Sequence, residues 1–181
     1  MSILSNHPHP HPVLRRMVGW LALAGMVGIV FGAVGLFIAG LTYGLPLMLL
    51  MIPFLLGMIF PLIILTALHP QITLQEEGVR IKPLVWKARM VAWEQLTALT
   101  DHSLMKPPPP ARQQNLTKRP VTKGQMILVE KGALGWAFRV VGFAAGHGTT
   151  PVFAISSKSH RDYDQLLQTI KHRIHQQKEQ A

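Results

Sequence analysis

The main feature of the hydrophobic pattern is an apolar stretch, residues 17–68, that contains no Asp, Glu, Lys or Arg. A helix needs about 20 apolar residues to cross the hydrocarbon core of a bilayer, so this stretch is long enough for two crossings. Gly and Pro cluster with polar residues at 42–46 and indicate a break there. We therefore predict a two-span transmembrane hairpin over residues 17–68, with spans at 18–41 and 45–68.

Small residues recur in the first predicted span at intervals of three and four, which places them on one face of a helix. Such a face lets another helix approach closely, and Gly28 and Gly32 form the GxxxG spacing. Two interpretations stay open: the face packs on the second span of the hairpin, or it docks on a helix of a partner. The small face consists of Gly25, Gly28, Gly32, Gly35 and Ala39.

The second predicted span contains two prolines in its interior, Pro53 and Pro61. Each removes a backbone hydrogen bond, so we expect the second span to bend. Neither span contains an ionisable side chain, and this disfavours a proton relay or an ion pathway.

After residue 69 the hydrophobic period changes to the alternation typical of strands. Residues 72–74, 79–81 and 90–99 predict short strands, separated by turns at 76–78 and 83–86 and by a corner near Glu94. Further strands are predicted at 125–130, 135–142 and 151–155. A final amphipathic helix follows, with an apolar face of Tyr163, Leu166, Leu167, Ile170 and Ile174.

These patterns divide the chain into four parts. Residues 1–16 form a flexible tail rich in His and Pro, residues 17–68 form the hairpin, residues 69–176 form one domain, and residues 177–181 form a polar tail. Within the domain, residues 101–124 form a long loop with four consecutive prolines, which favour polyproline II and offer no N–H donors to a sheet.

The charge indicates which side of the membrane the domain occupies. The chain has a net charge of +10, and basic residues flank both ends of the hairpin while the connection between its spans is uncharged. The positive-inside rule then places both termini in the cytoplasm, as expected for a multi-pass protein of a bacterial inner membrane. A basic domain beside a membrane attracts anionic lipid head groups. No basic run with interleaved aromatic residues indicates nucleic-acid binding.

Catalytic and metal-binding patterns are weak. His7, His9 and His11 alternate with proline in the tail, where three imidazoles are able to bind a transition metal, but no Cys or carboxylate nearby completes a site, and a solvated tail is the simpler interpretation. The remaining histidines are scattered, and the chain contains no cysteine, no HExxH and no GxSxG. We therefore predict no catalytic residue, no metal site and no cofactor.

Two segments in the domain resemble the opening of bacterial pleckstrin-homology-like (PH-like) domains: Thr73-Leu74-Gln75-Glu76-Glu77-Gly78-Val79-Arg80-Ile81 and Val91-Ala92-Trp93-Glu94-Gln95-Leu96. The resemblance covers residues 71–175, and many such proteins carry a transmembrane hairpin before the domain. It implies an all-β or α+β barrel of about seven strands that is closed by the C-terminal helix. It also implies a binding module and places lipid or partner contacts at the basic first strand pair, Arg80, Lys82, Lys87 and Arg89. The alternative is that these four residues are juxtamembrane charges that face lipid head groups without specificity.

These observations predict a non-catalytic membrane-anchored scaffold or accessory subunit. Its hairpin is expected to bind a larger membrane protein complex or further copies of the chain, and its domain is expected to bind protein or anionic lipid. One alternative is a small oligomeric transport or channel component, although two spans offer few polar groups to line a pathway. A membrane-bound enzyme is the other alternative, and it would need a site assembled from residues that the sequence does not bring together.

Overall fold

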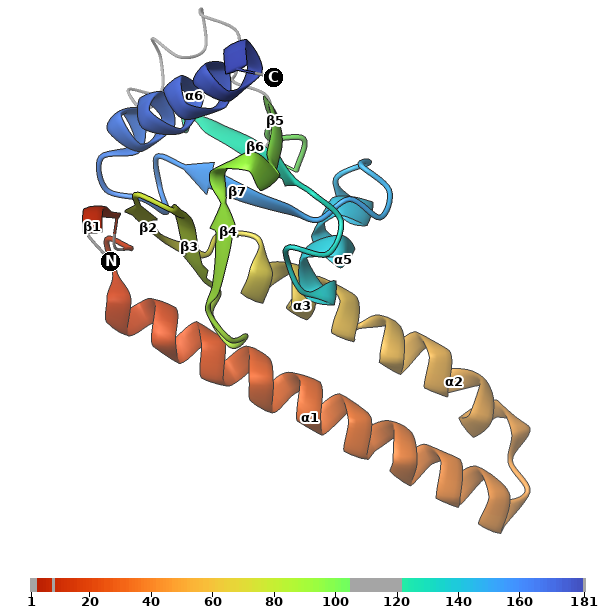
Figure 1. Cartoon of the computed structure of the whole chain (residues 1–181). Coiled ribbons are helices and arrows are strands. Elements are labelled where there is room, and N and C mark those ends of the chain that lie inside the picture. Colours follow the sequence, from red (N-terminus) through yellow and green to blue (C-terminus); the bar gives the residue numbers. More distant parts are fainter. Residues whose placement is uncertain (1–2, 8, 105–121, 181) are drawn as a thin grey trace, which may run out of the picture.

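The protein has two apolar helical arms, two small antiparallel sheets and further helices that pack on the sheets (Figure 1). The computed structural model describes residues 3–7, 9–104 and 122–180. Helix α1 runs from Pro12 to Tyr43, and the chain returns through α2, Pro46–Gly57, and α3, Ile59–Ala67. The reversal lies at Gly44, whose positive φ of 61° suits a residue without a side chain. The predicted break between the two spans is therefore confirmed.

The returning arm is interrupted at Met58, between α2 and α3. Pro61 has no N–H to donate to the carbonyl of Gly57, four residues earlier. At the same point the amide of Met58 donates to the carbonyl of Leu55, three residues earlier, at 3.1 Å, so the last turn of α2 is tighter than an α-helical turn. Pro53 lies inside α2 without ending it. Of the two predicted bends, the one at Pro61 thus coincides with a break between helices.

Both helical arms are long and apolar enough to cross a membrane. At 1.5 Å per residue, the 32 residues of α1 span about 48 Å, and the 22 residues from Pro46 to Ala67 span about 33 Å. In the most apolar 18-residue part of each arm, only 11% of the residues of the first arm and 6% of those of the second are buried. The core helix of a soluble protein would be mostly buried. The α1 helix begins at Pro12, six residues before the predicted span, because its first turns pack beside the β-domain rather than in the apolar layer (Figure 1).

The first sheet has the order β1-β2-β3-β4, with all neighbouring strands antiparallel. Its strands are β1, Ile3–His7; β2, Gln71–Gln75; β3, Gly78–Lys82; and β4, Arg89–Ala92. The pairs Ile72–Ile81 and Leu74–Val79 lie opposite each other on the buried face, as the alternation predicts.

The N-terminal segment differs from the predicted flexible tail. Residues Ile3–His7 pair with the outer edge of β2, and Thr73 Oγ1 donates a hydrogen bond to Asn6 Oδ1 at 3.3 Å. The free edge of β2 supplies the hydrogen-bond partners for the backbone of Ile3–His7. This segment has no clear alternation of apolar and polar residues, so its sequence alone does not predict a strand. The strand also places the start of the chain at the same end of the hairpin as the β-domain (Figure 1).

The second sheet has the order β5-β6-β7 and is also antiparallel. Its strands are β5, Leu96–Asp101; β6, Gly124–Val129; and β7, Val152–Ser156. A short 3-10 helix, Trp93–Gln95, forms the predicted corner between β4 and β5. The four-proline run of the predicted 101–124 loop lies outside the described residues.

The predicted closed barrel of about seven strands is not formed. In the described part of the chain, six strands follow the hairpin, and they belong to two separate sheets. The predicted strand at 135–142 is instead a helix, α5, Trp136–Ala144. Its Ala137, Phe138, Val141 and Gly142 are buried at helical spacing, so packing against α3 and β7 overrides the strand propensity of its aromatic and β-branched residues.

The last helix, α6, runs from Tyr163 to Gln180 and covers the domain on the side away from the hairpin (Figure 1). Its predicted apolar face is confirmed, because Leu166 and Ile170 are fully buried and Tyr163 and Ile174 nearly so. These side chains share one core with both sheets, and Ile63 and Ala67 of α3 belong to that same core. The hairpin is therefore packed into the domain rather than joined to it by a linker.

Candidate functional site

The loop between β3 and β4, residues 83–88, joins the β-domain to the root of the hairpin. Its Leu84 amide donates to the carbonyl of Thr66 on α3 at 3.1 Å, and the indole N–H of Trp86 donates to Thr66 Oγ1 at 3.2 Å. On the opposite side Leu84 packs over Gly19 of α1. The loop therefore sits between the two arms and places Gly19, Thr66 and Trp86 at one level along the hairpin.

The buried Arg15 provides a second connection between the hairpin and the domain. Its guanidinium Nη2 donates to the carbonyl oxygen of Lys82, at the end of β3, at 3.0 Å. The first turns of α1 are thereby held against the first sheet. This contact explains why the apolar helix extends beyond the predicted span on its N-terminal side.

Tryptophan and basic side chains surround this level on both sides of the loop. One pocket, between α1 and the loop, is lined by Arg16, Gly19, Trp20, Leu23, Leu84 and Val85. A second, of about 290 Å³, lies between the loop and α5 and is lined by Trp86, Lys87, Arg89, Gly135, Trp136, Ala137 and Phe138. We call the basic and tryptophan members of these two pockets the collar: Arg16, Trp20, Trp86, Lys87, Arg89 and Trp136.

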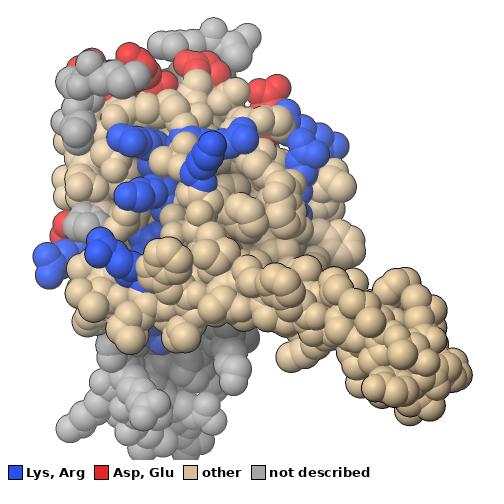
Figure 2. Space-filling view, turned by 90° about the horizontal axis from the view of Figure 1, so that it is seen from below, with Lys and Arg blue, Asp and Glu red and all other residues tan. Residues whose placement is uncertain are grey.

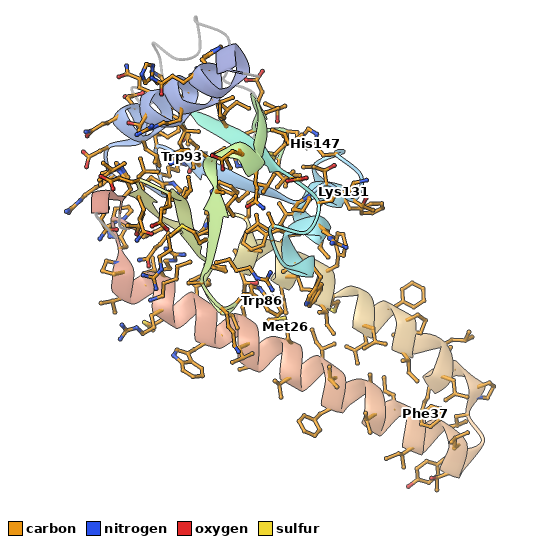
Figure 3. All side chains as sticks on the ribbon, viewed as in Figure 1. Met26, Phe37, Trp86, Trp93, Lys131 and His147 are labelled. Carbon is orange, nitrogen blue, oxygen red and sulfur yellow. The ribbon has the colours of Figure 1, made fainter. Side chains whose placement is uncertain are left out.

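The collar has the chemistry of a membrane–water interface. The rings of Trp86 and Trp136 meet edge to face, with centroids 5.2 Å apart, and Figure 3 shows Trp86 where the domain meets the hairpin. Trp20 is 67% exposed although it is a large apolar side chain. Tryptophan concentrates at the head-group level of bilayers, and Lys and Arg near helix ends extend to the same level. From Trp20 to Tyr43, α1 spans about 36 Å, enough for the apolar layer.

The four predicted basic residues do not form one site. Arg80 and Lys82 alternate with the buried Val79 and Ile81, so they lie on the outer face of the first sheet, whereas Lys87 and Arg89 belong to the collar. All four predicted side chains, Arg80, Lys82, Lys87 and Arg89, are exposed. Figure 2 shows Lys and Arg gathered on one face of the domain beside the hairpin, with acidic side chains at its edge.

The small face of α1 is also divided. A side chain at Gly25 would meet Leu62, and one at Gly32 would meet Leu55, so these two glycines contact the returning arm. Gly28 and Gly35 have open space around them. Ala39 is partly exposed.

The buried positions of α1 instead follow a neighbouring stripe, with separations of 4, 3, 11 and 7 residues that keep them on one helix face. They are Arg15, Gly19, Ala22, Ala33 and Gly40. The hairpin therefore uses one edge of the predicted small face and leaves Gly28 and Gly35 uncovered.

The fold brings together histidines that the sequence leaves scattered. The rings of His69 and His102 lie 5.3 Å apart, and His160 is buried nearby, where its Nε2 donates to the carbonyl of Pro70 at 2.9 Å. Its Nδ1 accepts from the amide of Ser156 at 3.4 Å, so the ring is held in the neutral Nε2–H form. Burial, with the neighbouring histidines, lowers the pKa of His69 to about 4, and burial lowers the pKa of His160 to about 4.

Among the described residues no three His, Asp or Glu side chains are arranged to hold a metal ion. His7 of the His-Pro segment is buried in β1, with its Nε2 3.0 Å from Ser5 Oγ. The sequence of the tail does not predict that His7 is buried, because its burial depends on the pairing of β1 with the edge of β2.

The tryptophan of the predicted Trp-centred motif has a structural role. Trp93 is buried under α6, and its indole N–H is shared between the carbonyls of Gln75 and Glu76, at 3.2 and 3.1 Å (Figure 3). The guanidinium carbon of Arg173 on α6 lies 5.7 Å from the centre of its ring. Trp93 therefore ties the β2–β3 turn to the β4–β5 corner and to the last helix.

The chain therefore has the architecture of an apolar helical hairpin followed by a small domain with two antiparallel sheets. The collar of tryptophan and basic residues lies where the hairpin meets the domain. No protein-family model, curated protein or solved structure matches the chain.

Proposed function

We propose that this protein is a non-catalytic membrane-anchored scaffold or accessory subunit. The hairpin crosses the membrane, both termini lie in the cytoplasm, and the collar marks the cytoplasmic interface. The basic residues flanking the hairpin and the positive-inside rule support this orientation in a bacterial inner membrane.

The observation that carries the proposal is the shared core between α3 and the domain. Ile63 and Ala67 of α3 are buried with side chains of both sheets and of α6. A helix used only as a tether needs no such packing, because a flexible linker holds a domain at the membrane equally well. A hairpin rigidly packed into its domain suits a subunit that presents that domain in one orientation to a neighbouring membrane protein.

Gly28 and Gly35 are the positions at which we place the partner helix. Both are exposed on α1 and offer a close backbone approach that the hairpin itself does not use. The basic outer face of the first sheet, with Arg80 and Lys82, then faces the cytoplasmic side of the partner or the anionic head groups around it.

The test compares two variants of the full chain in its native membranes. Gly28→Leu with Gly35→Leu fills the open surface, and Val34→Leu adds bulk at an exposed position on another face of α1. We expect a larger membrane protein, or further copies of this chain, to co-purify in mild detergent with the wild type and the Val34→Leu variant. We expect the double variant to lose that partner while remaining folded.

Two results would contradict the proposal. Purification of the wild type as a monomer, without a stoichiometric partner, would exclude the accessory-subunit role. Retention of the partner by the double variant would move the contact away from Gly28 and Gly35. A homo-oligomer that conducts ions or solutes in vesicles would favour the channel alternative instead.

A further inference from the structure

Helix α5 carries an exposed face that the β-domain does not cover. Trp136, Arg139 and Phe143 lie on this face, and Trp136 and Phe143 are 55% and 67% exposed. The opposite face, with Ala137, Phe138 and Val141, is buried in the core. A nine-residue surface helix in a soluble domain normally turns polar side chains outward, whereas two of these three are large aromatic residues.

The position of α5 relative to the hairpin gives this face a neighbour. The ring of Phe143 meets the ring of Phe60 on α3 edge to face, with centroids 6.3 Å apart. Thr66 lies at the level of the collar, and Phe60 precedes it by six residues, which is about 9 Å along the helix. Trp136 meets Trp86 at the collar itself. Figure 1 shows α5 beside α3, outside the hairpin.

We propose that α5 is an interfacial helix that inserts Trp136 and Phe143 into the boundary between head groups and acyl chains of the leaflet that contains the collar. The inference rests on the membrane anchoring in the proposed function. A helix of this kind lies with its apolar face about 5–10 Å deep in that boundary, which agrees with the 9 Å between Phe60 and Thr66.

Lipid fits this face better than another protein does, for two reasons. The aromatic surface continues onto α3, where Phe60 meets Phe143 and is 37% exposed, so any bilayer that surrounds α3 also reaches Phe143. Arg139, the only charged residue of α5, lies between the two aromatic residues in sequence and suits a phosphate head group. Insertion would fix the tilt of the β-domain on the membrane in addition to the contact through α3.

The absence of cysteine from the sequence allows a direct measurement of depth. Single cysteines are introduced by Phe143→Cys, Phe37→Cys and Gln168→Cys and are labelled with an environment-sensitive fluorophore. The full-length protein is reconstituted into vesicles of phosphatidylcholine and phosphatidylglycerol. Doxyl-labelled lipid then quenches fluorophores in the bilayer, and iodide quenches those in water.

Phe37 and Gln168 are the matched controls. Phe37 is 51% exposed near the tip of the hairpin (Figure 3), and Gln168 is exposed on α6, which lies on the far side of the domain. We expect the labels at 143 and 37 to be quenched several times more strongly by doxyl lipid than the label at 168, which iodide should quench instead.

The outcomes separate this inference from the membrane anchoring on which it rests. Quenching at 37 by lipid, with the label at 143 reached only by iodide, would overturn the interfacial helix and leave the anchored hairpin intact. A label at 143 that neither quencher reaches would show that another copy of the chain covers α5. If lipid does not quench the label at 37, the membrane-spanning hairpin and the proposed function fail together.

Discussion

At the scale of single residues, Trp93 shows how one side chain connects elements distant in sequence. Its indole N–H serves the carbonyls of Gln75 and Glu76, and its ring lies beside Arg173 of α6. Its neighbour Gln95 holds the same corner, because its Oε1 accepts from the amide of Ala92 at 3.1 Å. The corner between β4 and β5 is thus specified by side chains and not by a Gly or Pro turn signal.

Replacing Trp93 with Phe should destabilise the domain. The substitution keeps an aromatic ring in the core but removes the donor for two carbonyl oxygens, of which that of Gln75 is buried, at a cost of about 1–3 kcal/mol. Thermal unfolding of the full chain in detergent measures the loss. Trp20→Phe is the matched control, since Trp20 is exposed and should leave the melting temperature unchanged. Equal melting temperatures for both variants would show that the indole N–H contributes little.

At the scale of elements, the hairpin depends on close approach near its tip. A Cβ added at Gly40 would lie 2.8 Å from Cδ2 of Leu49, whereas one at Gly35 would meet nothing within 4 Å. Both positions are glycines in the same helix, but only one of them faces the returning arm. This difference allows helix packing to be separated from helix propensity.

The Gly40→Leu substitution should loosen the hairpin, and Gly35→Leu should not. A bulky residue at position 40 forces the two arms apart, and overpacking of this kind costs about 1–3 kcal/mol. Size-exclusion chromatography after graded heating in detergent compares the two variants. If both lose stability to the same extent, the arms are not packed together at Gly40.

At the scale of the whole molecule, the buried histidines couple stability to pH. His69 lies two residues after α3, with its Nδ1 3.4 Å from the carbonyl oxygen of Ala154 in β7, and His160 follows Ser156, the last residue of that strand, by four residues. His160 is buried and His69 is half-buried, in a region where the root of the hairpin, the second sheet and the approach to α6 meet. Protonation of either ring would introduce a charge into this junction.

We expect the free energy of unfolding to fall as the pH decreases from about 6.5 to about 4. In this interval unfolded histidines bind protons while His69 and His160, with pKa values of about 4, remain neutral in the folded protein. The loss is on the order of 3 kcal/mol for each histidine if the two titrate independently, and it ends below pH 4, where both states are protonated.

Urea unfolding at several pH values, monitored by the fluorescence of the tryptophans, measures this dependence. The double variant His69→Gln with His160→Gln should show a shallower slope of stability against pH. His172→Gln, at an exposed position on α6, is the control and should keep the wild-type slope. If the double variant keeps the wild-type dependence of stability on pH, other groups are responsible for the acid sensitivity.

Local patterns in the sequence were sufficient wherever an element buries its own periodic face. The charge-free stretch with its Gly-Pro break specifies two apolar helices, and the alternation in residues 71–82 specifies the β2–β3 hairpin. The face of Leu166 and Ile170 likewise specifies α6. In each case the hydrophobic period is the physical cause of the element, so the period alone identifies it.

Contacts between distant segments decided the rest. The segment 135–142 has the residues of a strand, and only the surfaces of α3 and β7 make it a helix. Ile3–His7 becomes a strand because β2 has a free edge, and the small face of α1 is divided because the returning arm covers Gly25 and Gly32 but not Gly28 and Gly35. The collar and the histidine cluster likewise join residues far apart in sequence, and no local period encodes which surfaces will meet.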